Sequence, residues 1–126
     1  MINPGEFEWT VRPSTDPALP DRQVAALTDL AGFQHSRANM FRYPPGAVGR
    51  RHKDLAQEET FVVLAGTLSM YLGEPPERHD VEAGGLVHVE SGTLLQIANH
   101  GVDELRLYIY GAPPETGRGE FADSAV

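Results

Sequence analysis

Short runs of apolar or alternating residues, separated by turn signals, make up most of the chain after residue 36. The turn signals are clusters of proline, glycine and asparagine, such as Pro44-Pro45-Gly46 and Asn99-His100-Gly101. Six runs are predicted to be strands: residues 39–43, 60–64, 67–72, 86–89, 94–98 and 105–110. Because no long helix separates these runs, the pattern predicts an antiparallel sandwich or barrel.

The two ends of the chain are less regular than this central part. Residues 1–35, rich in proline and charge, are predicted to form an N-terminal arm and packing segment, with one strand at 7–11. Residues 23–31 within it fit a helix or a short strand equally well. Residues 36–112 form the predicted barrel, and residues 113–126 are expected to be a loosely attached C-terminal extension.

Composition narrows the class of protein. The length of 126 residues suits one domain, and 40% apolar content is too high for a disordered chain. The net charge of -8, from 18 acidic and 10 basic residues, argues against nucleic-acid binding. Without cysteine there is no disulfide or thiolate site, and no apolar run is long enough to span a membrane. We therefore expect a soluble, cytoplasmic protein with neither a nucleic-acid nor a membrane partner.

Two spaced patterns of polar residues and glycines lie in the predicted barrel. The first, G-x5-H-x-H-x4-E-x6-G, is met by Gly46, His52, Glu59 and Gly66, with Asp54 in place of the second histidine. The second pattern is G-x5-P-x-G-x2-H-x3-N. It is met by Gly84, Gly92 and Asn99, whereas Glu90 replaces the proline and Leu95 replaces the histidine.

These patterns are the two motifs of the cupin superfamily, and the chain resembles a small single-domain cupin over roughly residues 39–110. The resemblance implies an all-β fold, the double-stranded β-helix or jelly-roll barrel. It also implies that the functional groups lie inside the barrel. Because this fold hosts many unrelated activities, the resemblance alone does not define a function.

The resemblance also implies a metal site, which here is degenerate. His52, Asp54 and Glu59 stand at metal-ligating positions, whereas Leu95 supplies no ligand. One imidazole and two carboxylates favour a hard divalent cation, and manganese, iron, nickel and zinc are the candidates. Glu58 is a weaker alternative to Glu59, because the six-residue gap to Gly66 favours the latter. The competing interpretation is a pocket without metal, in which these residues form solvated ion pairs.

We expect a narrow and largely apolar cavity with a few polar groups at its mouth, suited to a small molecule. The residues predicted to line it are Arg42, Tyr43, His52, Phe61, Val63, Leu95 and Ile97. Arg42 is expected to project toward the cavity and recognise an anionic ligand, or else to pair with an acidic neighbour.

Three functions remain open from the sequence. The first is a small-molecule-binding cupin without catalysis. The second is a metal-dependent cupin enzyme of the dioxygenase, isomerase or decarboxylase type, which uses His52, Asp54 and Glu59. The third is a structural dimer module, in which Val62 and Leu64 on the outer sheet face contact a partner. A homodimer is compatible with all three.

Overall fold

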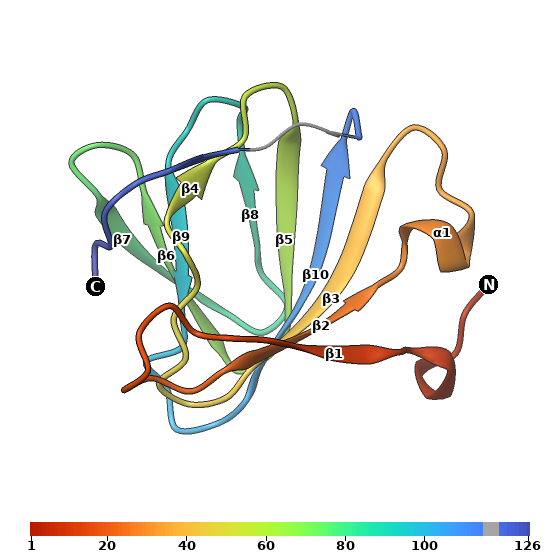
Figure 1. Ribbon diagram of the computed structural model, residues 1–126, viewed down its shortest axis with the longest axis horizontal. Helices are drawn as coiled ribbons and strands as arrows, with labels where there is room; N and C mark the ends of the chain where they lie inside the picture. The colour runs from red at the N-terminus through yellow and green to blue at the C-terminus, as the bar shows by residue number, and fades with distance from the viewer. Residues whose placement is uncertain (115–118) are drawn as a thin grey trace.

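Two antiparallel sheets face each other in the computed structural model, which describes residues 1–114 and 119–126 (Figure 1). In spatial order, the larger sheet contains β1 (Trp9–Arg12), β2 (Arg22–Ala26), β3 (Arg37–Tyr43), β10 (Leu105–Ala112), β5 (Glu58–Ala65) and β8 (Leu86–Val89). The smaller sheet contains β11 (Glu120–Phe121), β4 (His52–Lys53), β9 (Leu95–Ala98), β6 (Thr67–Leu72) and β7 (Glu77–Glu82). The predicted all-β jelly-roll fold is confirmed.

All six predicted strands are present, and the structure adds others that the hydrophobic pattern did not indicate. The ambiguous segment 23–31 divides into β2 and the short helix α1 (Thr28–Ala31), and a 3₁₀ helix, η1 (Pro4–Glu6), precedes β1. Strand β7 was missed because five of its six residues are exposed and polar, so it carries no apolar alternation. The strand forms nonetheless, because its backbone pairs with β6 along its whole length.

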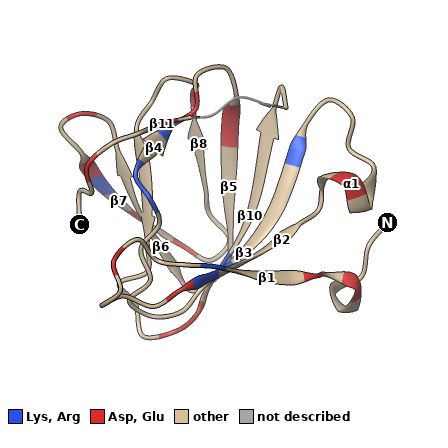
Figure 2. Ribbon diagram, in the orientation of Figure 1, with Lys and Arg blue, Asp and Glu red and all other residues tan. Residues whose placement is uncertain are grey.

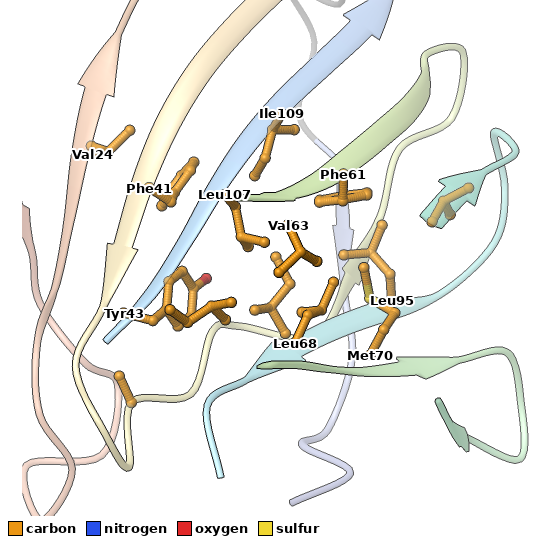
Figure 3. Packing of buried hydrophobic residues seen from close by; sticks show 14 residues of the cluster. Val24, Phe41, Tyr43, Phe61, Val63, Leu68, Met70, Leu95, Leu107 and Ile109 are labelled. Atoms are coloured by element: carbon orange, nitrogen blue, oxygen red, sulfur yellow. The ribbon is translucent and has the colours of Figure 1, made fainter. Parts of the chain in front are cut away.

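The core lies between the sheets (Figure 3), and on a strand such as β10 the inward-facing side chains alternate with more exposed ones. On β10, Leu105, Leu107 and Ile109 are buried and Arg106 and Tyr110 are exposed. These inward residues pack with others of both sheets, including Phe61, Val63, Leu68 and Met70. The burial of this apolar surface is the main stabilising term of the fold.

The N-terminal arm joins the larger sheet as its edge strand (Figure 1). Trp9 belongs to a second apolar cluster built around Ala25, Leu27 and Ala38. The Arg42 guanidinium lies over the Trp9 ring, 4.0 Å from its centroid, which adds a cation–π contact. The arm is therefore an integral part of this sheet.

The C-terminal residues 119–126 are also attached, so the expectation of a loose extension is wrong for them. Strand β11 pairs with β4, Arg51 Nη1 donates to the carbonyl of Asp123 at 3.1 Å, and the Ala125 N–H donates to Gln96 Oε1 at 2.8 Å. The predicted extension also includes residues 115–118, which lie outside the described residues. No helix among the described residues is long and apolar enough to cross a membrane.

Candidate functional site

A cavity of about 400 Å³ lies between the two sheets. This volume is near the lower end of the range for small-molecule sites, about 300–1,000 Å³. Its wall combines aromatic and aliphatic side chains, such as Phe41, Phe61 and Ile97, with many charged and polar groups. The expected apolar cavity with few polar groups is therefore wrong in its chemistry.

The three residues that the first motif indicates come together on this wall. His52, Asp54 and Glu59 each offer one ligand atom, and these atoms all lie within 4.8 Å of one another. His52 lies on β4, Asp54 follows that strand, and Glu59 lies on β5 of the other sheet. The face-to-face packing of the two sheets thus brings together one imidazole and two carboxylates.

The orientation of His52 suits a metal ligand. Its Nδ1 lies 3.0 Å from the backbone carbonyl of Arg50, which can only accept a hydrogen bond, so Nδ1 carries the hydrogen. In the neutral ring the lone pair then belongs to Nε2, which faces Asp54 Oδ2 at 3.8 Å. Histidine ligands of metals are commonly held by such a second hydrogen bond.

The donor set and its spacing fit one divalent cation. Bonds from metal to oxygen or nitrogen of about 2.0–2.6 Å put ligands on opposite sides of an ion about 4–5 Å apart. Leu95, which replaces the motif histidine, pairs directly across the strands with His52 and is only 2% exposed. The ion would therefore have three protein ligands and an apolar neighbour at the fourth position.

The two adjacent glutamates of β5 have opposite surroundings. Glu59 lines the cavity, whereas Glu58 is exposed and lies 3.9 Å from His88 Nε2. This alternation places Glu59, and not Glu58, beside His52.

Arginines form much of the remaining cavity wall. Arg12, Arg22, Arg37 and Arg50 all line it, from the arm, β2, β3 and the segment before β4. Arg22 Nη1 donates to the Tyr43 hydroxyl at 3.4 Å. Burial raises the pKa of Tyr43, and the positive charge of Arg22 only partly opposes this effect, so the phenol stays protonated at neutral pH.

The structure distributes the other predicted pocket residues between the cavity and its surroundings. Tyr43, Phe61, Leu95 and Ile97 line the cavity, whereas Val63 is buried in the apolar core beyond it. The expected inward orientation of Arg42 is wrong, because Tyr43 faces inward on β3 and its neighbour must face outward.

Several cavity residues were missed from the sequence. Arg37 and Asn39 share the inward face of β3 with Phe41 and Tyr43, so the period-two alternation of that strand could have indicated them. Arg12 and Phe121 come from the two end segments, whose strand pairing carries no local sequence signal.

The family model of the Cupin domain (Cupin_2) matches residues 39–110, and the chain therefore belongs to the cupin family. No curated protein matches the chain.

Solved structures of cupins share its fold. A cupin-superfamily sugar phosphate isomerase from Silicibacter pomeroyi has a TM-score of 0.76 and 21% identity, over 90% of this chain and 76% of that chain. A predicted oxalate decarboxylase from Thermotoga maritima has a TM-score of 0.77 and 17% identity, over 90% and 99%. The polyketide cyclase RemF from Streptomyces resistomycificus has a TM-score of 0.78 and 15% identity, over 99% and 86%. At these identities the likeness shows the fold alone.

Proposed function

We propose that this protein is a small-molecule-binding cupin, whose ligand lies in the cavity beside a divalent cation held by His52, Asp54 and Glu59. The observation that carries the proposal is the meeting of three ligand atoms, within 4.8 Å of one another, on the wall of a cavity of about 400 Å³. A site of this size and mixed lining suits a small organic molecule.

The residues around the cation site have separate parts in binding. A bound cation would supply positive charge and open coordination positions for an oxygen of the ligand. The Arg50 carbonyl holds the His52 ring so that Nε2 faces the site. Phe41 and Phe61 offer apolar surface for the body of a ligand, and the protonated Tyr43 hydroxyl can donate a hydrogen bond.

Metal content measured by plasma mass spectrometry tests the cation site. We expect wild-type protein purified without chelator, and incubated with manganese, iron, nickel or zinc, to retain one ion per chain. His52→Ala should retain none, whereas Glu58→Gln, which changes an exposed carboxylate outside the cavity, should retain the ion. Full metal content in His52→Ala would exclude this site.

A second candidate function is metal-dependent catalysis of the dioxygenase, isomerase or decarboxylase type. It is favoured by the position of the three ligating residues on the cavity wall, where a bound cation would face the ligand directly. Turnover that requires the cation and is lost in Glu59→Gln, but kept in Glu58→Gln, would establish catalysis. Ligand binding without cation-dependent turnover would leave a binding protein.

The expected homodimer is a further part of the proposal, together with a cytoplasmic location. Leu86 is 60% exposed and Leu64 is 50% exposed on neighbouring strands of the larger sheet. Val62, which pairs directly with Leu86, is partly exposed between them. Light scattering should show a dimer for the wild type and a monomer for Leu86→Glu; a monomeric wild type would contradict the dimer.

A further inference from the structure

The cavity concentrates positive charge in a chain that is acidic overall. The whole chain has ten lysines and arginines and 18 aspartates and glutamates. Among the residues that the structure describes, four of these basic residues line the cavity, but only two of the acidic ones do. Blue segments lie on β3 and beside β4, strands of different sheets (Figure 2). An excess of positive charge in a cleft attracts ligands of the opposite sign.

The basic residues inside and outside the cavity differ in their partners. Outside it, four form ion pairs with carboxylates: Arg51 with Glu74, Lys53 with Glu120, Arg78 with Asp80 and Arg106 with Glu104. Among the described residues, none of the four cavity arginines forms an ion pair. Arg12 and Arg50 lie instead over the rings of Phe41 and Phe121. Acidic residues are in excess in this chain, so a shortage of carboxylates does not explain the difference.

Arg22 is the most informative of the four. It is only 8% exposed, and its Nε is buried without a hydrogen-bond partner among the described residues. The long hydrogen bond to Tyr43 satisfies only part of the guanidinium. A buried charge without an opposite charge is costly, which favours an anionic ligand as its partner.

Glycine at position 49 keeps the space beside this group open. A Cβ there would lie 2.7 Å from the Tyr43 hydroxyl oxygen and 3.2 Å from Arg22 Nη1. Contacts this short would force the Arg22–Tyr43 pair to shift. The glycine therefore leaves both polar groups undisturbed at the cavity wall.

We infer that the cavity ligand is a small organic acid, whose oxyanion binds Arg22 and whose apolar part packs against Phe41 and Phe61. This inference rests on the proposed function and names the class of its ligand. Guanidinium groups bind carboxylates and phosphates through paired, charge-assisted hydrogen bonds. Arg12, Arg37 and Arg50 add positive charge around the same cavity.

Three probes with the same aromatic ring test the inference: benzoate, phenyl phosphate and benzyl alcohol. Each is titrated into the full chain and followed by NMR spectroscopy, once without a divalent cation and once with magnesium. Magnesium is used in place of manganese because it is diamagnetic. We expect at least one anion to bind about tenfold or more tightly than the alcohol. The tighter of the two anions identifies carboxylate or phosphate as the preferred oxyanion.

Variants assign the effect to the cavity. Arg22→Gln should weaken anion binding about tenfold and leave alcohol binding unchanged. If Arg22→Gln does not fold, Arg37→Gln takes its place in the test. Arg37 lies at an exposed position of the cavity wall, and its replacement should also weaken anion binding. Arg106→Gln removes the same charge outside the cavity and should bind like the wild type.

The outcomes separate this inference from the proposed function. Equal binding of the alcohol and both anions, or wild-type anion affinity in the folded Arg22 and Arg37 variants, would overturn the anion inference and leave cavity binding intact. If no probe shifts any cavity resonance, both the inference and cavity binding are overturned.

Discussion

The cavity and the apolar core lie between the same two sheets but receive different side chains from the same strands. Along β5, the inward residues change from Val63 in the core to Phe61 and then Glu59 at the cavity. Along β3 they change from Tyr43 and Phe41 to Asn39 and Arg37. The apolar part of this gradient is visible in Figure 3.

The difference shows where the structure favours stability and where it favours binding. The apolar core is closely packed, as in an ordinary protein interior, and its side chains include the fully buried Leu68, Met70 and Leu107. The cavity instead gathers four arginines and two carboxylates and leaves volume unfilled, and both the partly buried charges and the empty volume cost stability. Local departures of this kind are typical of functional sites.

Removal of a core side chain should have the largest effect on stability. Leu68→Ala is expected to lower the free energy of unfolding by about 2–5 kcal/mol, because a fully buried leucine leaves a void. Arg37→Gln at the cavity should change it by less than about 0.5 kcal/mol. Urea denaturation measures both, and comparable losses would remove the distinction between core and cavity.

Two adjacent arginines sharpen the comparison. Arg51 is 6% exposed and donates from Nη2 to the Gly73 carbonyl at 2.9 Å and from Nη1 to the Asp123 carbonyl, whereas Arg50 is exposed at the cavity. We expect Arg51→Gln to destabilise the fold by about 1–3 kcal/mol and Arg50→Gln to have little effect. Limited proteolysis should also release the C-terminal segment faster in Arg51→Gln. Equal behaviour of the two variants would contradict their assignment to different roles.

Restoration of the missing motif histidine should strengthen cation binding. Leu95 lies directly opposite His52, so Leu95→His adds an imidazole beside the present donors. We expect manganese affinity to rise about tenfold or more, an effect comparable to that of groups supporting metal ligands. Without metal, the buried polar ring should lower the thermal midpoint. Calorimetry and thermal unfolding, each with and without manganese, check both effects; an unchanged affinity would argue against a cation at this position.

The smallest predicted effect concerns a hydrogen-bonded network of Ser69, Arg78 and Asp80, none of which lines the cavity. Hydrogen bonds from Arg78 and then Ser69 lower the pKa of Asp80 from its ordinary value of 3.8. The contribution of the ionised Asp80 carboxylate to the free energy of unfolding is therefore fully present above pH 3.8. It is lost as the pH falls through the lower pKa of the folded state. The stability difference between wild type and Asp80→Asn should be under about 1 kcal/mol at neutral pH and shrink in that acidic window. A difference that grows on acidification in urea titrations would contradict this sign.

Sequence reasoning predicted the fold better than the chemistry of the cavity. The alternating runs indicated six strands, and the motif spacing indicated His52, Asp54 and Glu59, which the structure brings together. The prediction for Arg42 was wrong because neighbouring residues of a strand face opposite sides, and on β3 the inward position belongs to Tyr43. Arg22 and Phe121 could not be predicted, because they reach the cavity through pairing of the terminal segments with distant strands.

Calorimetric titration of Glu59→Gln and Glu58→Gln with manganese tests the central claim most directly. The two variants remove the same charge from adjacent residues on opposite faces of β5. The wild type and Glu58→Gln should bind one ion per chain, and Glu59→Gln should bind at least about tenfold more weakly. Equal manganese affinity in the two variants would show that the cation, if bound, does not use this cavity site.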